Sequence, residues 1–297
     1  MDKVIINEVG PRDGLQNDAA DVSPAERVML INALVDAGLR AVEVASFVSP
    51  RAVPKMAGAR EVIAALDATT ADFSALIPNQ KGYELAKAAG VNSVAVVLSA
   101  TETMNLKNIN MSLSTAANVC CDILTEAKQA GIVARAYVAV AVECPYEGLV
   151  SPVEVEGLTR LMFDAGATEV IIADTIGAAN PVQIKALFGR LVDVFGAHRL
   201  SAHFHDTRAM ALANAWQALE CGIRKFDASI GGLGGCPFAP GAAGNLATED
   251  IAYMLSQAGF STGINMGKLL EVVAFTERLV KHPVGGRTLA YLKNNHY

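Results

Sequence analysis

One pattern of apolar and polar residues repeats along the chain. A helical stretch ends in a small or apolar residue followed by glycine, and a short run rich in Val, Ile and Ala comes next. Glycine just past a helix end adopts the left-handed conformation that closes the helix, and short apolar runs suit strands buried on both faces of a parallel sheet. The repeat occurs at Ala37-Gly38, Ala89-Gly90, Ala130-Gly131, Ala165-Gly166, Phe195-Gly196 and Cys221-Gly222.

The predicted helices also begin in a regular way. Ser23 and Ser151 are each followed by Pro and, three residues on, by Glu, which is a capping box with Pro at the first helical position. Asn180, with Pro next and Gln183 three residues on, is a variant of the same box. Strand, loop, capped helix, glycine and strand again is the order of βαβ units.

Eight strands are predicted, each followed by a helical stretch. Eight such units within about 250 residues are typical of a (β/α)8 barrel. An open doubly wound sheet usually has fewer strands and carries a GxGxxG turn after the first one, whereas this chain has Gly10-Pro11-Arg12-Asp13-Gly14 there. The strands are expected at residues 4–9, 41–44, 73–77, 94–98, 133–140, 170–172, 200–205 and 226–230.

We therefore expect an α/β fold, a TIM barrel over about residues 4–258. A helical extension is expected at about 259–297, with one helix at 266–281. The sequence shows no linker that would separate a second domain, so residues 1–297 are expected to form a single domain.

Composition narrows the class of protein. Of 297 residues, 52% are apolar and 18% charged, with a net charge of −6; this combination excludes disorder. The densest apolar stretch, 133–142, is interrupted by Arg135 and is far short of the roughly 20 residues that span a bilayer, so we expect no membrane association. An acidic balance without basic runs argues against nucleic acid.

Cysteine usage and the start of the chain indicate a reducing compartment. The five cysteines are odd in number and show no CxxC spacing, which argues against a disulfide framework and a zinc knuckle. The first residues show no secretory or transit signal, so the expected location is the cytoplasm.

Ionisable side chains follow five of the eight predicted strands, in a chain that is otherwise poor in charge. The active site of a barrel lies at the carboxyl ends of its strands, so these side chains are the candidates for chemistry. At these five ends lie, with their polar neighbours, Arg12, Asp13 and Gln16 after the first strand, Glu43 and Ser46 on the second, Glu143 and Cys144 after the fifth, Asp174 and Thr175 after the sixth, and His203, His205 and Asp206 on the seventh. The eighth strand is followed by a glycine-dense segment with Cys236 and Asn245.

The His203-x-His205 pair is the main indication of a metal. Both imidazoles lie on one face of a strand, and inside a barrel two unpaired imidazoles would be poorly solvated. A carboxylate from Asp13 would complete a set of N and O ligands. Without clustered thiolates, such a set suits Mg²⁺, Mn²⁺ or Zn²⁺ rather than a structural zinc site.

The other candidates have structural alternatives. Arg12 and Asp13 form a local salt bridge on one reading, with Glu43 as a further partner of Arg12. Asn245, taken alone, is expected to be a turn or cap residue.

Helix capping and burial explain the remaining candidates on the same structural reading. Asp206 and Thr207 are expected to cap the following helix. Cys236 is either a small buried apolar residue or a thiol on a loop that moves as a lid does. Cys144 stays undecided between these readings.

The motifs around these residues resemble the 3-hydroxy-3-methylglutaryl-CoA lyases, which are metal-dependent (β/α)8 enzymes. The resemblance covers residues 4–281, and the cysteine loop is specific to the lyases because the condensing synthases of the same superfamily lack it. The segments that carry it are Val9-Gly10-Pro11-Arg12-Asp13-Gly14-Leu15-Gln16-Asn17, Ser46-Phe47-Val48-Ser49-Pro50, Asp174-Thr175-Ile176-Gly177, His203-Phe204-His205-Asp206-Thr207 and the run from Gly232 to Asp250.

The resemblance implies a divalent-metal-dependent cleavage of 3-hydroxy-3-methylglutaryl-CoA, or of a close 3-alkyl analogue, to acetyl-CoA and a 3-oxo acid such as acetoacetate. It implies one cation, Mg²⁺ or Mn²⁺ with Zn²⁺ as a further option, an acyl-CoA substrate and a homodimer. The implied metal ligands are Asp13, His203, His205 and Asn245.

The resemblance also assigns roles in catalysis. Arg12 would stabilise the enolate oxygen, Glu43 would support the arginine and metal cluster, and Asp174 would assist proton transfer. His203 would take part in deprotonating the C3 hydroxyl, and Cys236 would help protonate the acetyl-CoA carbanion.

Departures from the family pattern bear on the substrate. Arg208, followed by Ala209-Met210, stands where members often have Tyr or Gly followed by Gly-Gln, and it is expected to pair with a distal carboxylate. The other departures are Pro240-Gly241-Ala242-Ala243 for Gly-Ala-Ser, Ala45 for Thr and Ala173 for Gly. The expected substrate contacts are Gln16, Ser46, Thr175 and Arg208.

Three other functions remain open from sequence. One is an acyl-CoA-dependent aldolase or synthase on the same barrel, another a non-catalytic CoA- or metabolite-binding protein, and the third a metal-assisted hydrolase.

Overall fold

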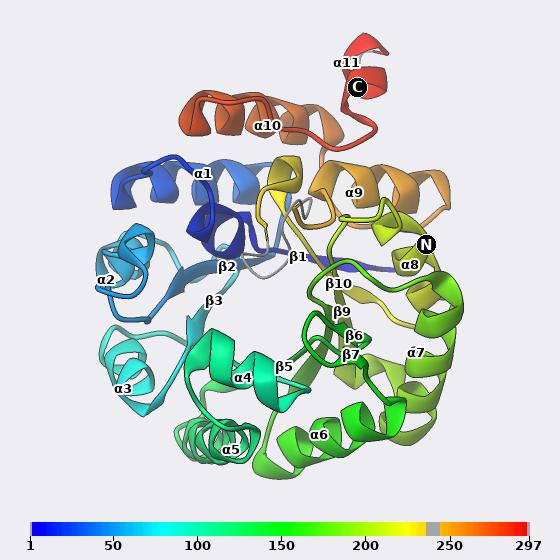
Figure 1. Ribbon diagram of the computed structural model, residues 1–297. Helices are drawn as coiled ribbons and strands as arrows, with labels where there is room; N and C mark the ends of the chain where they lie inside the picture. Colours follow the sequence, from blue (N-terminus) through cyan, green and yellow to red (C-terminus); the bar gives the residue numbers. More distant parts are fainter. Residues whose placement is uncertain (1, 236–243, 296–297) are drawn as a thin grey trace.

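The computed structural model describes residues 2–235 and 244–295, and its centre is a closed barrel of parallel strands (Figure 1). Around the ring the order is β1-β10-β9-β8-β5-β4-β3-β2, and β1 pairs with both β10 and β2. The strands are β1 (Ile5–Glu8), β2 (Ala41–Ser46), β3 (Asp72–Ile77), β4 (Ser93–Ser99), β5 (Val133–Ala139), β8 (Glu169–Asp174), β9 (Leu200–Phe204) and β10 (Lys225–Ala228). Each of the eight predicted strands is present, so the expected TIM barrel is confirmed.

Helices connect the strands and surround the barrel (Figure 1). The capping boxes at Ser23, Ser151 and Asn180 are all formed. The glycines expected to close helices all have positive φ, from 70° at Gly131 to 115° at Gly166. The helices between strands are α1 (Pro24–Asp36), α2 (Ala59–Ala64), α3 (Gln80–Ala88), α4 (Glu102–Ile109), α5 (Leu113–Gln129), α6 (Pro152–Ala165), α7 (Pro181–Phe195) and α8 (Ala211–Glu220).

Two short elements at the carboxyl end of the barrel were not predicted from the sequence. One is the helix α4, which precedes α5 in the connection after β4. The other is a small antiparallel hairpin after β5, formed by β6 (Glu143–Cys144) and β7 (Gly148–Leu149). Their few residues give no periodic signal, and the N-cap residue of α4, Thr101, makes no side-chain capping hydrogen bond.

The chain after the barrel forms α9 (Thr248–Gln257), α10 (Met266–Val280) and α11 (Leu289–Asn294). The helix expected at 266–281 is therefore present as α10, which lies beside α1 (Figure 1). A glycine permits the approach, because a Cβ at Gly38 would lie 2.3 Å from the carbonyl oxygen of Gly263.

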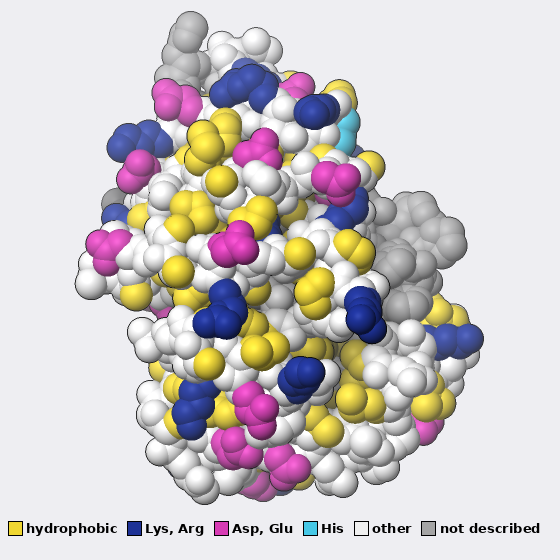
Figure 2. Space-filling model, turned by 90° about the vertical axis from the view of Figure 1, so that its left-hand side faces the viewer, with side chains coloured by type: hydrophobic (Ala, Val, Ile, Leu, Met, Phe, Trp, Pro, Cys, Tyr) yellow, Lys and Arg dark blue, Asp and Glu magenta, His cyan; other side chains and the backbone are white. Residues whose placement is uncertain are grey.

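Many of the apolar side chains that make up 52% of the sequence lie inside the fold. Every residue of β2 and β9 is buried, as expected for strands packed between barrel interior and helices. On the face over α1 to α3, exposed hydrophobic side chains lie interspersed with charged ones (Figure 2). Within residues 2–235 and 244–295, no helix has the length and apolarity needed to cross a membrane.

Candidate active site

The carboxyl ends of the strands surround a cavity of about 270 Å³, called the upper cavity here. Helix α4 forms part of its wall through Met104, Asn108 and Ile109. The polar and glycine residues that line it are Arg12, Asp13, Gln16, Asn17, Ser46, Asn108, Tyr137, Thr175, His203, His205 and Gly235.

Arg12 and Asp13 lie on one tight turn, the π-helical segment η1 (Gly10–Gly14), directly after β1. The carbonyl oxygen of Val9 accepts the N–H groups of both residues, at 3.1 and 2.7 Å. A Cβ at Gly14 would lie 2.9 Å from side-chain atoms of the segment after β10, so only glycine lets the turn pack there. The turn therefore fixes a cation and an anion side by side at the cavity.

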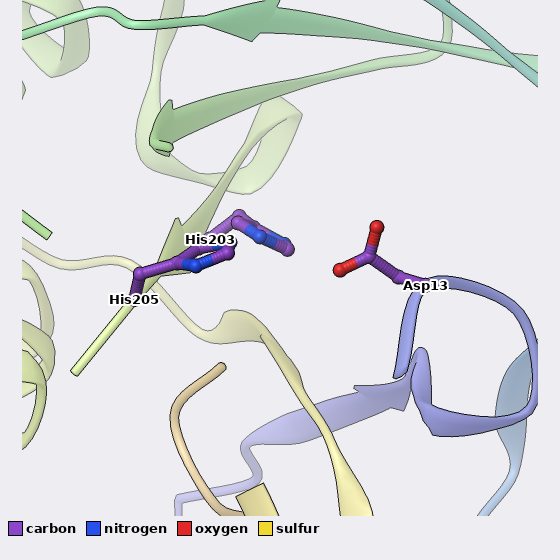
Figure 3. A group of neighbouring side chains, drawn as sticks. All are labelled: Asp13, His203 and His205. Carbon is purple, nitrogen blue, oxygen red and sulfur yellow. The ribbon is translucent and has the colours of Figure 1, made fainter. Parts of the chain in front are cut away.

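His203 and His205 lie on either side of Phe204 at the end of β9, so both imidazoles point into the barrel. One ligand atom from each ring and one carboxylate oxygen of Asp13 lie within 4.8 Å of one another. Figure 3 shows the rings, from β9, and the carboxylate, from the turn after β1, around a common space. We call these three residues the His-Asp cluster; two buried imidazoles and a partly exposed carboxylate in this arrangement fit a divalent cation.

Burial and local charge set the protonation of the cluster. Burial, aided by the neighbouring His203, lowers the pKa of His205 to about 4. Burial alone raises the pKa of Asp13, but Arg12 and the two histidines outweigh it and bring that pKa to about 2. At pH 7 the cluster thus contains a neutral imidazole and an ionised carboxylate, which are the forms that bind metal ions.

Arg12 bridges the cluster to a buried glutamate. Its Nη1 donates to Asp13 Oδ1 at 2.7 Å, and its Nε donates to Glu43 Oε1. Arg12 is 6% and Glu43 1% exposed. The other glutamate oxygen, Oε2, is buried without a hydrogen-bond partner among the described residues. The salt bridge considered from sequence is thus present, and two of its members, Arg12 and Asp13, line the upper cavity.

Asn245 lies opposite His205 as its bridge partner. Its Nδ2 donates to Asp13 Oδ2 at 2.8 Å and to the carbonyl oxygen of Leu233 at 3.1 Å. Within the described ranges, Asn245 Oδ1 and His205 Nδ1 are both buried and without a partner. The expected cap role is wrong, because α9 has its N-cap at Ala247; the amide instead faces the His-Asp cluster.

Three of the four expected substrate contacts, Gln16, Ser46 and Thr175, line the upper cavity. The hydroxyl of Ser46 is buried and has no partner in the part of the chain that the structure describes. The hydroxyl oxygen of Thr175 accepts the N–H of Val140 at 2.8 Å. Ser46 is therefore the freer of the two hydroxyls.

Asp174 and Arg208 do not line this cavity. The carboxylate of Asp174 accepts the N–H groups of Ala178 and Ala179 at 2.9 and 3.0 Å, and burial raises its pKa. The half-exposed guanidinium of Arg208 donates to the carbonyl oxygen of Ala178 at 3.1 Å and lies 3.4 Å from Glu143. The structure therefore places both against the loop between β8 and α7, and not in the His-Asp cluster.

Cys236 lies outside the described residues. The residue before it, Gly235, lines the upper cavity and accepts a hydrogen bond from Asn17 at 3.2 Å. The undecided Cys144 is buried on β6, where its sulfur accepts the hydroxyl of Thr101 at 3.1 Å. The surroundings of Cys144 are thus those of a small buried residue with a hydrogen-bond partner.

The expected caps of the helix after β9 are only partly formed. Asp206 Oδ1 accepts the N–H of Ala211, the first residue of α8, at 3.0 Å. Thr207 Oγ1 has no partner within residues 2–235 and 244–295. A cap at Thr207 is wrong because the helix begins four residues further along the chain.

Two buried residues next to His203 were not among the candidates predicted from the sequence. Asp227 Oδ2 lies 3.0 Å from His203 Nδ1 and accepts the hydroxyl of Tyr137 at 2.8 Å. A signal was present: Asp227 is a lone acid inside the apolar run 226–230. A charged residue within a buried strand is rare unless it is paired.

A second cavity, of about 400 Å³, lies at the amino ends of the strands and is called the lower cavity. Four of the charged side chains that line it form ion pairs, Arg135 with Asp72 and Lys225 with Glu169. Asp227 contributes to its wall and so lies between the two cavities.

The sequence matches a known family model and is similar to curated proteins. The family model described as HMGL-like matches residues 3–276. A hydroxymethylglutaryl-CoA lyase of Bacillus subtilis is 42% identical over 294 residues, covering 99% of this chain and 98% of the relative.

Solved structures of HMG-CoA lyases also superpose closely on this chain. The HMG-CoA lyase of Bacillus subtilis superposes with a TM-score of 0.95 at 42% identity, covering 99% of both chains. The HMG-CoA lyase of Acinetobacter baumannii, solved with coenzyme A and 3-methylmalate, gives a TM-score of 0.94 at 36% identity, covering 99% of this chain and 97% of that one.

Proposed function

The chain belongs to the family of hydroxymethylglutaryl-CoA lyases, and we propose that it cleaves 3-hydroxy-3-methylglutaryl-CoA, or a close 3-alkyl analogue, to acetyl-CoA and a 3-oxo acid. The observation that carries the proposal is the His-Asp cluster with Arg12 beside it in one cavity. The reaction breaks the C2–C3 bond and leaves the electron pair on the thioester enolate, so the site must stabilise a developing negative oxygen.

The residues of the cluster fit a divalent cation. Asp13, His203 and His205 would hold it, and the buried, unpartnered Oδ1 of Asn245 would complete the set. When bound, the cation would acidify the C3 hydroxyl of the substrate. Mixed N and O donors without thiolates favour Mg²⁺ or Mn²⁺, with Zn²⁺ as a further option.

His203 has one ring nitrogen to offer. Because its Nδ1 is held by Asp227, only Nε2 is available, and a single lone pair serves the cation or a proton but not both at once. We assign Nε2 to the cation, so that His203 contributes to deprotonation of the C3 hydroxyl indirectly.

Arg12 would stabilise the enolate oxygen. Its guanidinium is buried, and Glu43 and Asp13 fix it by hydrogen bonds at two of its nitrogens. A cation held in this way needs no reorganisation when negative charge appears on the substrate. Glu43 is thus a positioning residue for Arg12.

Cys236 would supply the proton that converts the carbanion into the acetyl group. Support comes from its chain neighbour Gly235, which lines the upper cavity. For Asp174 we propose a part in proton transfer, with its carboxylate held by the N–H groups of Ala178 and Ala179. Gln16, Ser46 and Thr175 would contact the substrate, whereas Arg208 would act at the rim.

The experiment is a steady-state assay of purified protein with Mg²⁺ on 3-hydroxy-3-methylglutaryl-CoA and its 3-ethyl and 3-hydrogen analogues, following acetyl-CoA and the 3-oxo acid. Release of both products from one thioester supports the lyase. Condensation of acetyl-CoA with a 3-oxo acid as the only reaction would support the synthase. A protein that turns over none of the thioesters would overturn the proposal.

A further inference from the structure

Asp227 lies in the middle of a row of polar residues on three neighbouring strands. In the barrel register Asn7 of β1 is opposite Asp227 of β10, which is opposite His203 of β9. Asp227 is 3% exposed and has a partner on each side. Asn7 Nδ2 donates to its Oδ1 at 2.8 Å, and its Oδ2 lies 3.0 Å from His203 Nδ1.

A third contact fixes the direction of these hydrogen bonds. The phenol of Tyr137 donates to Asp227 Oδ2 at 2.8 Å. An amide N–H and a phenol O–H both donate, so both oxygens of Asp227 act as acceptors, as they do in a carboxylate. Nδ1 of His203 must therefore be the donor in its contact with the same oxygen.

This assigns the tautomer of His203. A neutral imidazole carries one N–H, so a proton on Nδ1 leaves the lone pair on Nε2. The Tyr137 ring also packs against the imidazole in a T-shaped arrangement, with centroids 6.0 Å apart and an angle of 85° between planes. The imidazole of His203 is thus held by a hydrogen bond from Nδ1 to Asp227 and by packing against the Tyr137 ring.

His205 provides the contrast within the same cluster. Its Nδ1 is buried without a partner in the described part of the chain, so none of the described residues selects its tautomer through that nitrogen. In the His-Asp cluster, therefore, Nδ1 of His203 contacts a carboxylate, whereas Nδ1 of His205 has no such partner among the described residues.

We propose that Asp227 is a positioning residue that fixes His203 as the Nδ1–H tautomer and aims its Nε2 at the cation of the His-Asp cluster. The inference rests on the proposed metal centre but not on the identity of the thioester. Carboxylates that hold metal-binding histidines in this way typically contribute 10–100-fold to metal affinity.

The first test measures metal affinity without substrate. Apo-protein is titrated with Mn²⁺, and free Mn²⁺ is followed by electron paramagnetic resonance. We expect Asp227→Asn to raise the Kd about 10-fold, because an amide oxygen still accepts the N–H but without charge. Asp227→Ala should raise it up to about 100-fold, because the acceptor is gone.

Asp72→Asn is the matched control. It makes the same carboxylate-to-amide change at the lower cavity, where Asp72 pairs with Arg135 and has no contact with His203. Its Kd should stay within twofold of the wild type, and thermal melting confirms that each variant is folded.

The second test reads the tautomer directly in the wild type. Long-range ¹H–¹⁵N spectra of the histidine-labelled apo-protein, at a pH where the ring is neutral, distinguish Nδ1–H from Nε2–H, and a His203→Gln sample assigns the signal among the five histidines. We expect Nδ1–H in the wild type and loss of that preference in Asp227→Ala.

Each outcome has a defined meaning. An Nε2–H signal for wild-type His203, or unchanged Mn²⁺ affinity in both Asp227 variants, would overturn the role of Asp227 and leave the proposed metal centre standing. If the wild type binds no Mn²⁺, the metal centre and this inference fail together. Because the tautomer is read in the wild type, a variant that does not fold leaves the proposal testable.

Discussion

Both ends of the barrel contain a polar cavity, but the ends differ in how far their charged and polar side chains are paired. The lower cavity is the larger, about 400 against 270 Å³. Four of its charged side chains, all at least partly exposed, are paired with one another. At the upper end, Glu43 Oε2, His205 Nδ1 and Asn245 Oδ1 are buried without partners among the described residues. In the described lining of the lower cavity one side-chain atom, Asn7 Oδ1, is buried without a partner. The concentration of unsatisfied polar atoms at the His-Asp cluster, and not cavity size, therefore marks the end that is built for a ligand.

The difference has an energetic meaning. A buried polar atom without a partner costs about 1–3 kcal/mol, so natural folds keep few of them. Three such atoms around one cluster indicate that a ligand supplies the missing contacts. The comparison therefore predicts large effects on activity at the upper end and small effects on stability at the lower end.

The largest effect is expected for Asp13→Asn. The change removes the anionic ligand of the cluster while keeping the size of the side chain. A bound cation contributes several kcal/mol, so kcat/KM should fall on the order of a thousand-fold. Acetyl-CoA release with saturating Mg²⁺ measures the change. A loss smaller than tenfold would contradict the assignment of Asp13 as a ligand.

Arg12→Lys should have the next largest effect. The substitution keeps the charge but loses the fork that bonds Glu43 and Asp13 together. We expect kcat to fall about 100–1,000-fold with KM nearly unchanged, because the lost interaction acts on the enolate oxygen. Steady-state kinetics separates the two constants, and a loss confined to KM would speak for ground-state binding instead.

Glu8→Gln tests a buried carboxylate of the upper end that is fully satisfied. Glu8 Oε1 accepts the N–H groups of Gly10 and Ile230, and Oε2 accepts the hydroxyl of Thr248. Burial raises its pKa from 4.5 to about 7. The folded state therefore holds a proton that the unfolded state loses, and stability from this group falls as pH rises from about 4.5 to 7.

The variant lacks this titration. Relative to the wild type, its free energy of unfolding should rise by roughly 2–3 kcal/mol between pH 5 and pH 8. Urea unfolding at both pH values measures this difference. A constant difference would show that Glu8 is ionised in the fold, and the contrast with the unsatisfied Glu43 would weaken.

The smallest effect is expected for Asp72→Asn at the lower end. The carboxylate is 45% exposed and pairs with Arg135. Such pairs contribute about 0.2–1 kcal/mol, so the midpoint of urea unfolding should move slightly and kcat/KM should stay the same. A tenfold loss of activity would mean that the lower cavity takes part in the reaction.

Local signals made most of the fold readable from the sequence. The capping boxes at Ser23, Ser151 and Asn180 and the closing glycines depend only on residues within a turn of one another. The apolar runs between them had one physical interpretation, strands buried on both faces. The hairpin β6–β7 and helix α4 are too short to produce such a signal.

The site was readable only where its residues follow one strand each. Asp13 and the two histidines were found in this way. Asp227 and Tyr137 act through contacts across strands, and these depend on the register that pairs Asp227 with His203. Asp174 was placed at a strand end correctly, but its carboxylate turns toward the amides of its own loop. Such directions are set by the closed barrel.

The most direct test of the proposed metal centre is to locate the cation that the protein binds. Crystals of the protein grown or soaked with Mn²⁺ should show one strong anomalous peak between Asp13, His203 and His205, within bonding distance of all three. A peak in the lower cavity with none at the His-Asp cluster would contradict the account, because the paired charges would then be the ones that bind the ion.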